Sequence, residues 1–112
     1  IRMASKVLVI ISTGEAEKAL TGLMYAHRTM SEGWIDDVKV VFFGPSERLL
    51  VRDERVAQIA QQICEAEKPF VCKFISDQEG ISEQIESLGL KVEYVVTIIS
   101  DFIKEGYAPM VF

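Results

Sequence analysis

The chain has 112 residues, of which 49% are hydrophobic and 26% are charged. These values are ordinary for one globular domain, and they exclude a second core and a disordered chain. The formal net charge of -5 gives no general attraction for phosphate backbones or anionic lipid, so we expect neither nucleic acid nor a membrane as a partner.

The cysteine and histidine content argues against metal and disulfide chemistry. Cys64 and Cys72 are too few for a disulfide scaffold, and their spacing fits no paired zinc-ligand motif. The only histidine is His27, which is expected to be a packed or capping residue. We therefore expect no metal site and no cofactor.

The start of the sequence predicts a cytoplasmic protein. The longest purely apolar run, Val7 to Ile11, is too short to span a membrane, and no signal peptide is visible. Met3 is the expected initiator, which places the domain at residues 3–112. Ile1 and Arg2 are expected to derive from an expression vector.

The first part of the chain predicts two strands with a helix between them. A nearly continuous β-branched run at residues 6–12 indicates a central strand that is covered on both faces. Apolar residues then recur at helical spacing, which predicts a helix over residues 15–31 that Gly33 ends. A second strand is expected at residues 38–43, where the turn signal Gly44-Pro45-Ser46 stops it.

The rest of the chain continues this alternation after a short connecting segment around residues 49–51. A helix at residues 53–67 carries an apolar stripe that includes Cys64, and Pro69 ends it. The elements expected after it are a strand at 70–75, a helix at 79–88 capped by Gly89, a strand at 90–94, a helix at 96–104 and a strand at 108–112.

The order of these elements, β-α-β-α-β-α-β-α-β, determines the expected fold. Alternation of strands and helices implies right-handed crossovers and a parallel sheet. We therefore predict an α/β fold in a single domain, with a parallel five-stranded sheet and helices on both faces, flavodoxin-like in shape. In such a sheet, ligands bind beyond the carboxyl ends of the strands.

Two turns at that edge are candidates for binding a small anion or substrate. Free amides around Ser12, Thr13 and Gly14 could hold an anion at the start of the first helix, although a plain N-cap and turn accounts for the same residues. Gly44 and Ser46 follow the second strand, and they too could either bind a small anion or substrate or form a plain tight turn. No phosphate-binding glycine motif is present, so nucleotide binding has weak support.

The third segment at that edge contains Cys72, the candidate catalytic residue. In a strand over residues 70–75, Phe70, Cys72 and Phe74 share one face. A thiol near a helix N-terminus and a lysine can have a lowered pKa, and the thiolate is the reactive form. The alternative is an inert cysteine buried between two phenylalanines. Cys64, on its helix stripe, is expected to be packed in the core.

Six short motifs along the chain suggest a family. They are Ser12-Thr13-Gly14, Val40-Val41-Phe42-Phe43-Gly44-Pro45, Lys68-Pro69-Phe70-Val71-Cys72, Gly80-Ile81, Leu88-Gly89-Leu90 and Glu105-Gly106-Tyr107. In this order and spacing, the chain resembles the DsrE/DsrF-like proteins of sulfur relay over essentially its whole length.

This resemblance implies a fold like the one predicted above and a possible sulfurtransferase or persulfide carrier. Members are commonly homo- or hetero-oligomers, often trimers or hexamers. Some carry sulfur as a persulfide on a cysteine in the segment that Cys72 matches, with sulfur-donor and acceptor proteins as partners. The residues at 73–80 lack the further cysteines and arginines of the stronger carriers.

Three functional hypotheses follow. The first is persulfide transfer or thiol chemistry through Cys72, which should then react with thiol reagents while Cys64 does not. The second is a non-catalytic oligomeric module that binds a small anion or a protein partner, and complete burial of Cys72 would favour it. The third, a nucleotide-binding domain, lacks a phosphate loop.

A homo-oligomer is expected on physical grounds, because a domain of this size buries less of its surface than a larger one. Apolar residues that a monomer would find hard to cover lie in connecting or terminal segments. They are Trp34, Leu49, Leu50, Val51, Met110 and Phe112.

Overall fold

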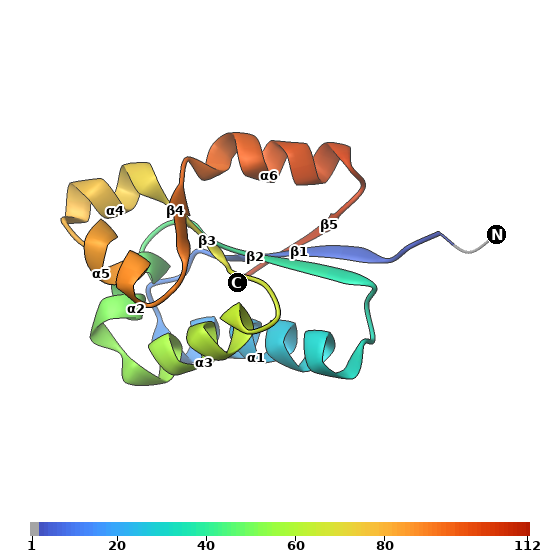
Figure 1. Ribbon diagram of the computed structural model, residues 1–112, viewed down its shortest axis with the longest axis horizontal. Helices are drawn as coiled ribbons and strands as arrows, with labels where there is room; N and C mark the ends of the chain where they lie inside the picture. The colour runs from blue at the N-terminus through green and yellow to red at the C-terminus, as the bar shows by residue number, and fades with distance from the viewer. Residues whose placement is uncertain (1–2) are drawn as a thin grey trace.

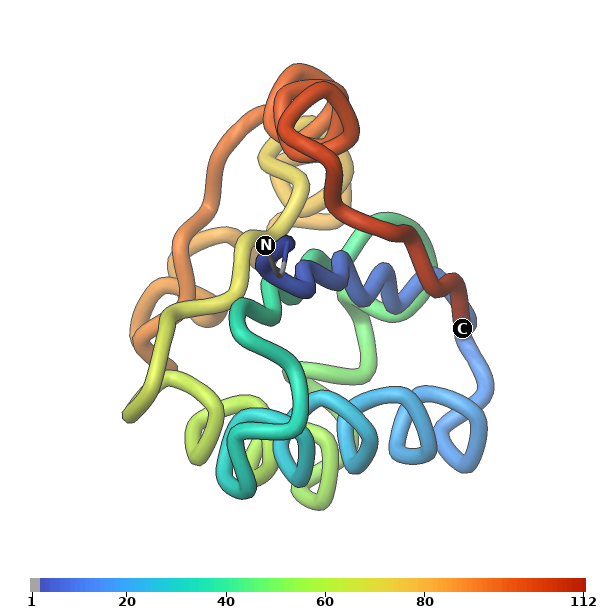
Figure 2. The backbone as a smooth tube through the Cα atoms, turned by 90° about the vertical axis from the view of Figure 1, so that its right-hand side faces the viewer, coloured from blue at the N-terminus to red at the C-terminus, as the bar shows by residue number. Residues whose placement is uncertain are grey.

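The first strand, β1 (Lys6–Ile11), lies inside a five-stranded parallel sheet, as its β-branched sequence predicts. β2 (Asp37–Phe42) pairs with one edge of β1, and the last strand, β5 (Ala108–Val111), pairs with the other. β3 (Phe70–Cys72) and β4 (Lys91–Glu93) complete the order β4-β3-β2-β1-β5. Figure 2 shows the C-terminal strand returning to the side of the sheet opposite β4.

The helices cover both faces of the sheet. In Figure 1, α1 (Ala16–Glu32) and α3 (Glu54–Cys64) lie below it, and α6 (Val95–Lys104) lies above it. Three shorter helices stand near the carboxyl ends of the strands: α2 (Ser46–Arg52), α4 (Lys73–Glu79) and α5 (Ser82–Ser87). This arrangement confirms the predicted α/β fold with a five-stranded parallel sheet.

Alternate residues of β1 supply two hydrophobic cores, one on each face of the sheet. Val9 and Ile11 belong to the larger core, which contains the buried sides of α1 and α3. Leu8 belongs to the smaller core on the α6 face, together with Val41, Cys72, Val95 and Tyr107. A single helix therefore covers most of one face, and Cys72 lies beneath it.

The sequence prediction was wrong around the third strand. The strand ends at Cys72, and residues 73–79 form α4 rather than continuing the predicted strand to 75. Gly80, at φ +70°, then ends α4 in the left-handed conformation that glycine adopts most easily, so the predicted helix at 79–88 is replaced by α5. Phe74 is 59% exposed on α4 and does not share a strand face with Cys72.

The connecting segment at 49–51 was also predicted incorrectly, because it belongs to α2. Leu50 is buried in the larger core, and Leu49 and Val51 pack against that core. These three residues are therefore covered within one copy of the chain. Trp34, in contrast, is 62% exposed, as expected for a residue that a monomer leaves uncovered.

The computed structural model describes residues 3–112. The expectation that Ile1 and Arg2 derive from an expression vector lies outside the described residues. Of the helices in the described range, none combines the length and hydrophobicity that crossing a bilayer requires.

Candidate functional site

The turn after β1 lies at the carboxyl edge of the sheet, but the amides of Ser12 and Thr13 are occupied within the chain. The backbone N–H groups of Ser12 and Thr13 both donate to the carbonyl oxygen of Phe112, at 2.7 and 3.1 Å. The hydroxyl of Thr13 accepts a hydrogen bond from the N–H of Glu15 at 3.0 Å. An anion in the predicted position would have to displace these bonds.

The turn after β2 packs directly against the turn after β1. The N–H of Ser46 donates to the carbonyl oxygen of Ser12 at 3.2 Å, and its hydroxyl donates to the carbonyl oxygen of Ile11. A Cβ added to Gly44 would lie 2.9 Å from the Ser12 hydroxyl, and one added to Gly14 would lie 3.0 Å from the Cβ of Pro45. The structure thus brings the predicted turn residues together and packs the two turns closely against each other.

A buried carboxyl group lies in the same place, and the sequence did not reveal it. The side chain of Glu47, in the first turn of α2, is fully buried. Its Oε2 accepts a hydrogen bond from the N–H of Gly44 at 3.2 Å, while its Oε1 has no hydrogen-bond partner among the described residues. Burial raises the pKa of Glu47 to about 7, and the charge of Glu79 adds to that rise against the Gly44 hydrogen bond.

Cys72 is the last residue of β3 and the N-cap residue of α4, where its side chain makes no capping hydrogen bond. It is only 3% exposed. The positive charge of the neighbouring Lys73 is already paired with the carboxylate of Asp77, at 2.7 Å. Cys72 therefore combines a suitable position at the sheet edge with very little access for a reagent.

Cys64 ends α3 and is partly buried against the larger core. Burial raises the pKa of its thiol, and the charge of Lys68 partly opposes that rise. Both cysteines are free. Within residues 3–112, no three histidine, cysteine, aspartate or glutamate side chains are grouped so that they could hold a metal ion.

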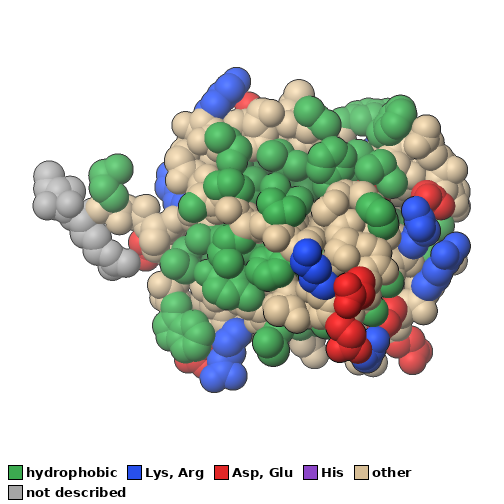
Figure 3. Space-filling view, turned by 180° about the vertical axis from the view of Figure 1, so that it is seen from behind, with side chains coloured by type: hydrophobic (Ala, Val, Ile, Leu, Met, Phe, Trp, Pro, Cys, Tyr) green, Lys and Arg blue, Asp and Glu red, His purple; other side chains and the backbone are tan. Residues whose placement is uncertain are grey.

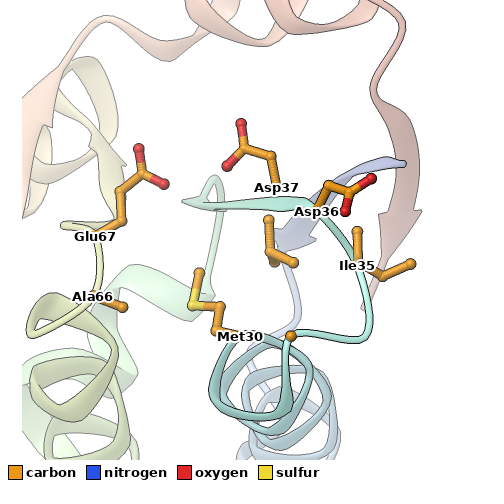
Figure 4. Close-up of a pocket in the computed structure, with 8 residues that line it drawn as sticks. Met30, Ile35, Asp36, Asp37, Ala66 and Glu67 are labelled. Carbon is orange, nitrogen blue, oxygen red and sulfur yellow. The ribbon is translucent and has the colours of Figure 1, made fainter. Parts of the chain in front are cut away.

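A polar pocket of about 220 Å³ lies at the opposite, amino-terminal end of the strands, beside Asp37 and Glu67 (Figure 4). In Figure 4, these two carboxylates extend to the same side, whereas Asp36 points away from them. Lys39 binds both of them, at 3.5 Å to Asp37, and Tyr107 donates a hydrogen bond to Asp37.

Lys39 offsets part of the negative charge of the two carboxylates. Burial, followed by the hydrogen bond to Asp37, raises the pKa of Tyr107. Burial alone would lower the pKa of Lys39, but Glu67 and Asp37 together raise it. The network joins β2 to the chain entering β5, and it lies far from the edge where ligands of parallel sheets bind. We interpret it as structural.

An apolar groove of about 500 Å³ runs between α1 and β5. Figure 3 views this side of the molecule and shows hydrophobic side chains gathered over α1, β5 and α6. The side chains lining the groove include Met24, Tyr25, Arg28, Trp34, Met110 and Phe112. The sequence marks Trp34, Met110 and Phe112 as hard to cover in a monomer, but it does not reveal the groove that they line.

Comparisons with known proteins identify a fold and no family. No protein-family model matches the sequence, and no curated protein matches it with significance. A solved structure of a conserved protein of unknown function from Bacteroides thetaiotaomicron is similar to 96% of this chain and 95% of that chain, with a TM-score of 0.83 and 20% sequence identity. At this identity the similarity establishes the shared α/β fold alone.

Proposed function

We propose that this chain is a DsrE-like cytoplasmic protein that acts as a non-catalytic, oligomeric binding module for a protein partner. The observation that carries the proposal is the burial of Cys72, which is 3% exposed. A thiolate that exchanges sulfur must be reachable by another sulfur atom. The two free cysteines agree with a reducing compartment.

The same edge of the sheet favours a protein over a small anion as the ligand. The amides of Ser12 and Thr13 are bound to Phe112, and a buried carboxyl group lies alongside. The first feature disfavours an added anion, because the amides of Ser12 and Thr13 already donate to a carbonyl oxygen. The buried carboxyl group offers no positive charge to attract one. Hydrophobic side chains nearby are instead open to solvent.

Three of those side chains offer a contact surface for a partner. Phe74 on α4 is 59% exposed, Tyr94 before α6 is 61% exposed, and Val96 in its first turn is 62% exposed. Aromatic residues are enriched in the buried centres of protein interfaces. The ion pair of Lys73 with Asp77 borders this surface, with the ammonium group of Lys73 6.0 Å from the ring centre of Tyr94.

Alkylation of the native protein tests the proposal. We expect Cys72 to stay unlabelled by iodoacetamide until the chain is unfolded, with the labelled peptides identified by mass spectrometry. The variants Cys64→Ser and Cys72→Ser assign each signal. Labelling of Cys72 in the folded protein before Cys64 would overturn the non-catalytic module.

A persulfide carrier is the second candidate, and the position of Cys72 favours it. The residue ends β3 at the ligand-binding edge, and its thiol has no capping role to give up. In this mechanism the Cys72 thiolate attacks the terminal sulfur of a donor persulfide, the donor S–S bond breaks, and the donor leaves as a thiolate. An acceptor thiolate then takes the same sulfur atom from Cys72, whose thiolate is regenerated.

Access for this chemistry would require the first turn of α6 to move, because Val95 belongs to the same buried cluster as Cys72. Incubation with a persulfide donor followed by mass spectrometry tests it. A gain of one sulfur atom on the Cys72 peptide, and none in Cys72→Ser, would favour the carrier over the module.

A further inference from the structure

The outer face of α1 carries a stripe of four exposed residues, which we call the α1 stripe: Glu17, Thr21, Met24 and Arg28. Their spacing of four, three and four residues places them on one side of the helix. The stripe lies opposite the buried side, which includes Leu23 and Ala26. It borders the apolar groove, because Thr21, Met24 and Arg28 also line that groove.

The α1 stripe is complementary to itself when it is reversed. Its midpoint falls between Gly22 and Leu23, so in an antiparallel pair of α1 helices Thr21 faces the other copy's Met24. Glu17 then faces Arg28 of the other copy, and the same pair recurs by symmetry. With a rise of about 1.5 Å per residue, each charge lies about 8 Å from the midpoint, so opposite charges meet at both ends.

We infer that a second copy of this chain docks on the α1 stripe and the adjoining groove through a two-fold axis. This inference rests on the proposed function, because it supplies the contact by which an oligomeric module assembles. Met24 of each copy lies near the axis and enters the groove of the other copy. Glu17 and Arg28 of opposite copies form two equivalent ion pairs. An isologous contact of this kind uses the same patch on both copies.

The uncovered hydrophobic surface gives the contact a driving force. Met24 is 61% exposed and Trp34 is 62% exposed beside the groove. A tryptophan at that exposure leaves on the order of 150 Å² open to water. Contiguous apolar surface of this kind is uncommon on monomers and typical of interaction sites.

The charges of the α1 stripe are available for pairing between copies. Glu17 contacts Arg55 at 3.3 Å, and Arg28 contacts Glu32 at 3.5 Å. All four side chains are well exposed, and exposed pairs contribute little to stability. Replacing these pairs within one copy by pairs between two copies therefore costs little free energy. The surrounding apolar surface strengthens the new pairs by excluding water.

The open edge of β5 indicates that side chains, not a continuous sheet, make the contact. Phe112 directs both its N–H and its C=O toward β1. Because neighbouring residues of a strand alternate, Val111 and Pro109 face the open side. Pro109 has no N–H to donate there, which discourages addition of another strand.

Charge reversal combined with light scattering tests the inference. Size-exclusion chromatography with light scattering should show an even-numbered assembly, and Met24→Asp should halve its mass. The matched control Ile103→Asp places the same charge at an exposed hydrophobic position on α6, outside both proposed contact surfaces, and should leave the mass unchanged. Circular dichroism should confirm that both variants fold, because both side chains are exposed.

The ion pairs are tested by Glu17→Arg and Arg28→Glu. Each change turns two attractive pairs into two repulsive ones, so each should weaken the association on the order of tenfold or more. The double variant restores opposite charges and should recover the association of the original chain. Recovery is specific to the antiparallel contact, because two substitutions that act independently would weaken the association further when they are combined.

Several results would overturn the inference. Light scattering could show a monomer both at high concentration and after 100-fold dilution, or it could show a closed trimer. Met24→Asp could leave the mass unchanged, or the double variant could associate no better than the single variants. An assembly that survives Met24→Asp leaves the binding module standing with a different contact. Labelling of native Cys72 would reject the module without affecting these measurements.

Discussion

Glu47 should make the stability of this protein fall as the pH rises toward neutrality. Its carboxyl group is buried with one oxygen unpartnered, and its pKa in the folded chain is about 7, against an ordinary value of 4.5. Below pH 4.5 the group is protonated in both states, so folding has no charge to bury. Between pH 4.5 and 7 the unfolded chain releases the proton while the folded chain retains it, which favours unfolding.

The size of this effect follows from the difference between the two pKa values. At about 1.4 kcal/mol per pKa unit, the loss in the free energy of unfolding reaches about 3 kcal/mol once the pH exceeds 7. Burial is the main cause of the raised pKa; the N–H of Gly44 opposes it, and the carboxylate of Glu79, itself paired with Arg48 at 3.1 Å, adds to it. Glu47→Gln replaces the acid by a neutral group of the same shape that still accepts from Gly44.

Urea unfolding at a fixed protein concentration, at several values between pH 4 and pH 8.5, measures the effect. The variant and the original chain should have similar stability at pH 4, and the variant should be about 3 kcal/mol more stable at pH 8. Taking the difference between the two chains removes the contributions that they share. Parallel pH curves for the two chains would refute the assignment of a buried, protonated Glu47.

Two further substitutions test how the loops and the structural network hold the fold. Tyr107→Phe removes the hydrogen bond to Asp37 while keeping the ring, and should lower the free energy of unfolding by about 2 kcal/mol in urea melts; an unchanged midpoint would show that the bond contributes nothing. Gly44→Ala should cost roughly 3 kcal/mol, because φ is +129° and the new Cβ would lie 2.9 Å from the Ser12 hydroxyl. Gly80→Ala is its control, with φ +70° and open space, and should cost only about 1 kcal/mol; equal losses would contradict the close packing of the two turns.

The fold could be predicted because its strongest signals are long or repeated. The β-branched run of β1 and the periodic helix α1 each extend over enough residues to determine their own structure. The short segment after Cys72 was ambiguous, because Phe74 and Ile75 fit an alternating strand as well as a helix. There Gly80, which ends α4, was the more informative residue.

The candidate site was harder to predict, since its properties arise from contacts between distant segments. The amides of Ser12 and Thr13 are occupied by Phe112, a hundred residues away in sequence, and no local pattern reveals that partner. Pro45 followed by Glu47 does signal the start of a helix, with an acid favoured in its first turn. Such an acid is ordinarily solvated, so the burial of Glu47 becomes visible only in the structure.

The pairing of β5 with β1 has a consequence for the order in which the protein is made. β1 leaves the ribosome before the other strands of this sheet, yet one of its edges stays unpaired until residues 108–112 have been synthesised. Until then, a strongly hydrophobic strand presents open backbone groups to other nascent chains. Folding of this domain must therefore be completed after translation of its last strand, and a chain that stops before Ala108 is expected to depend on chaperones.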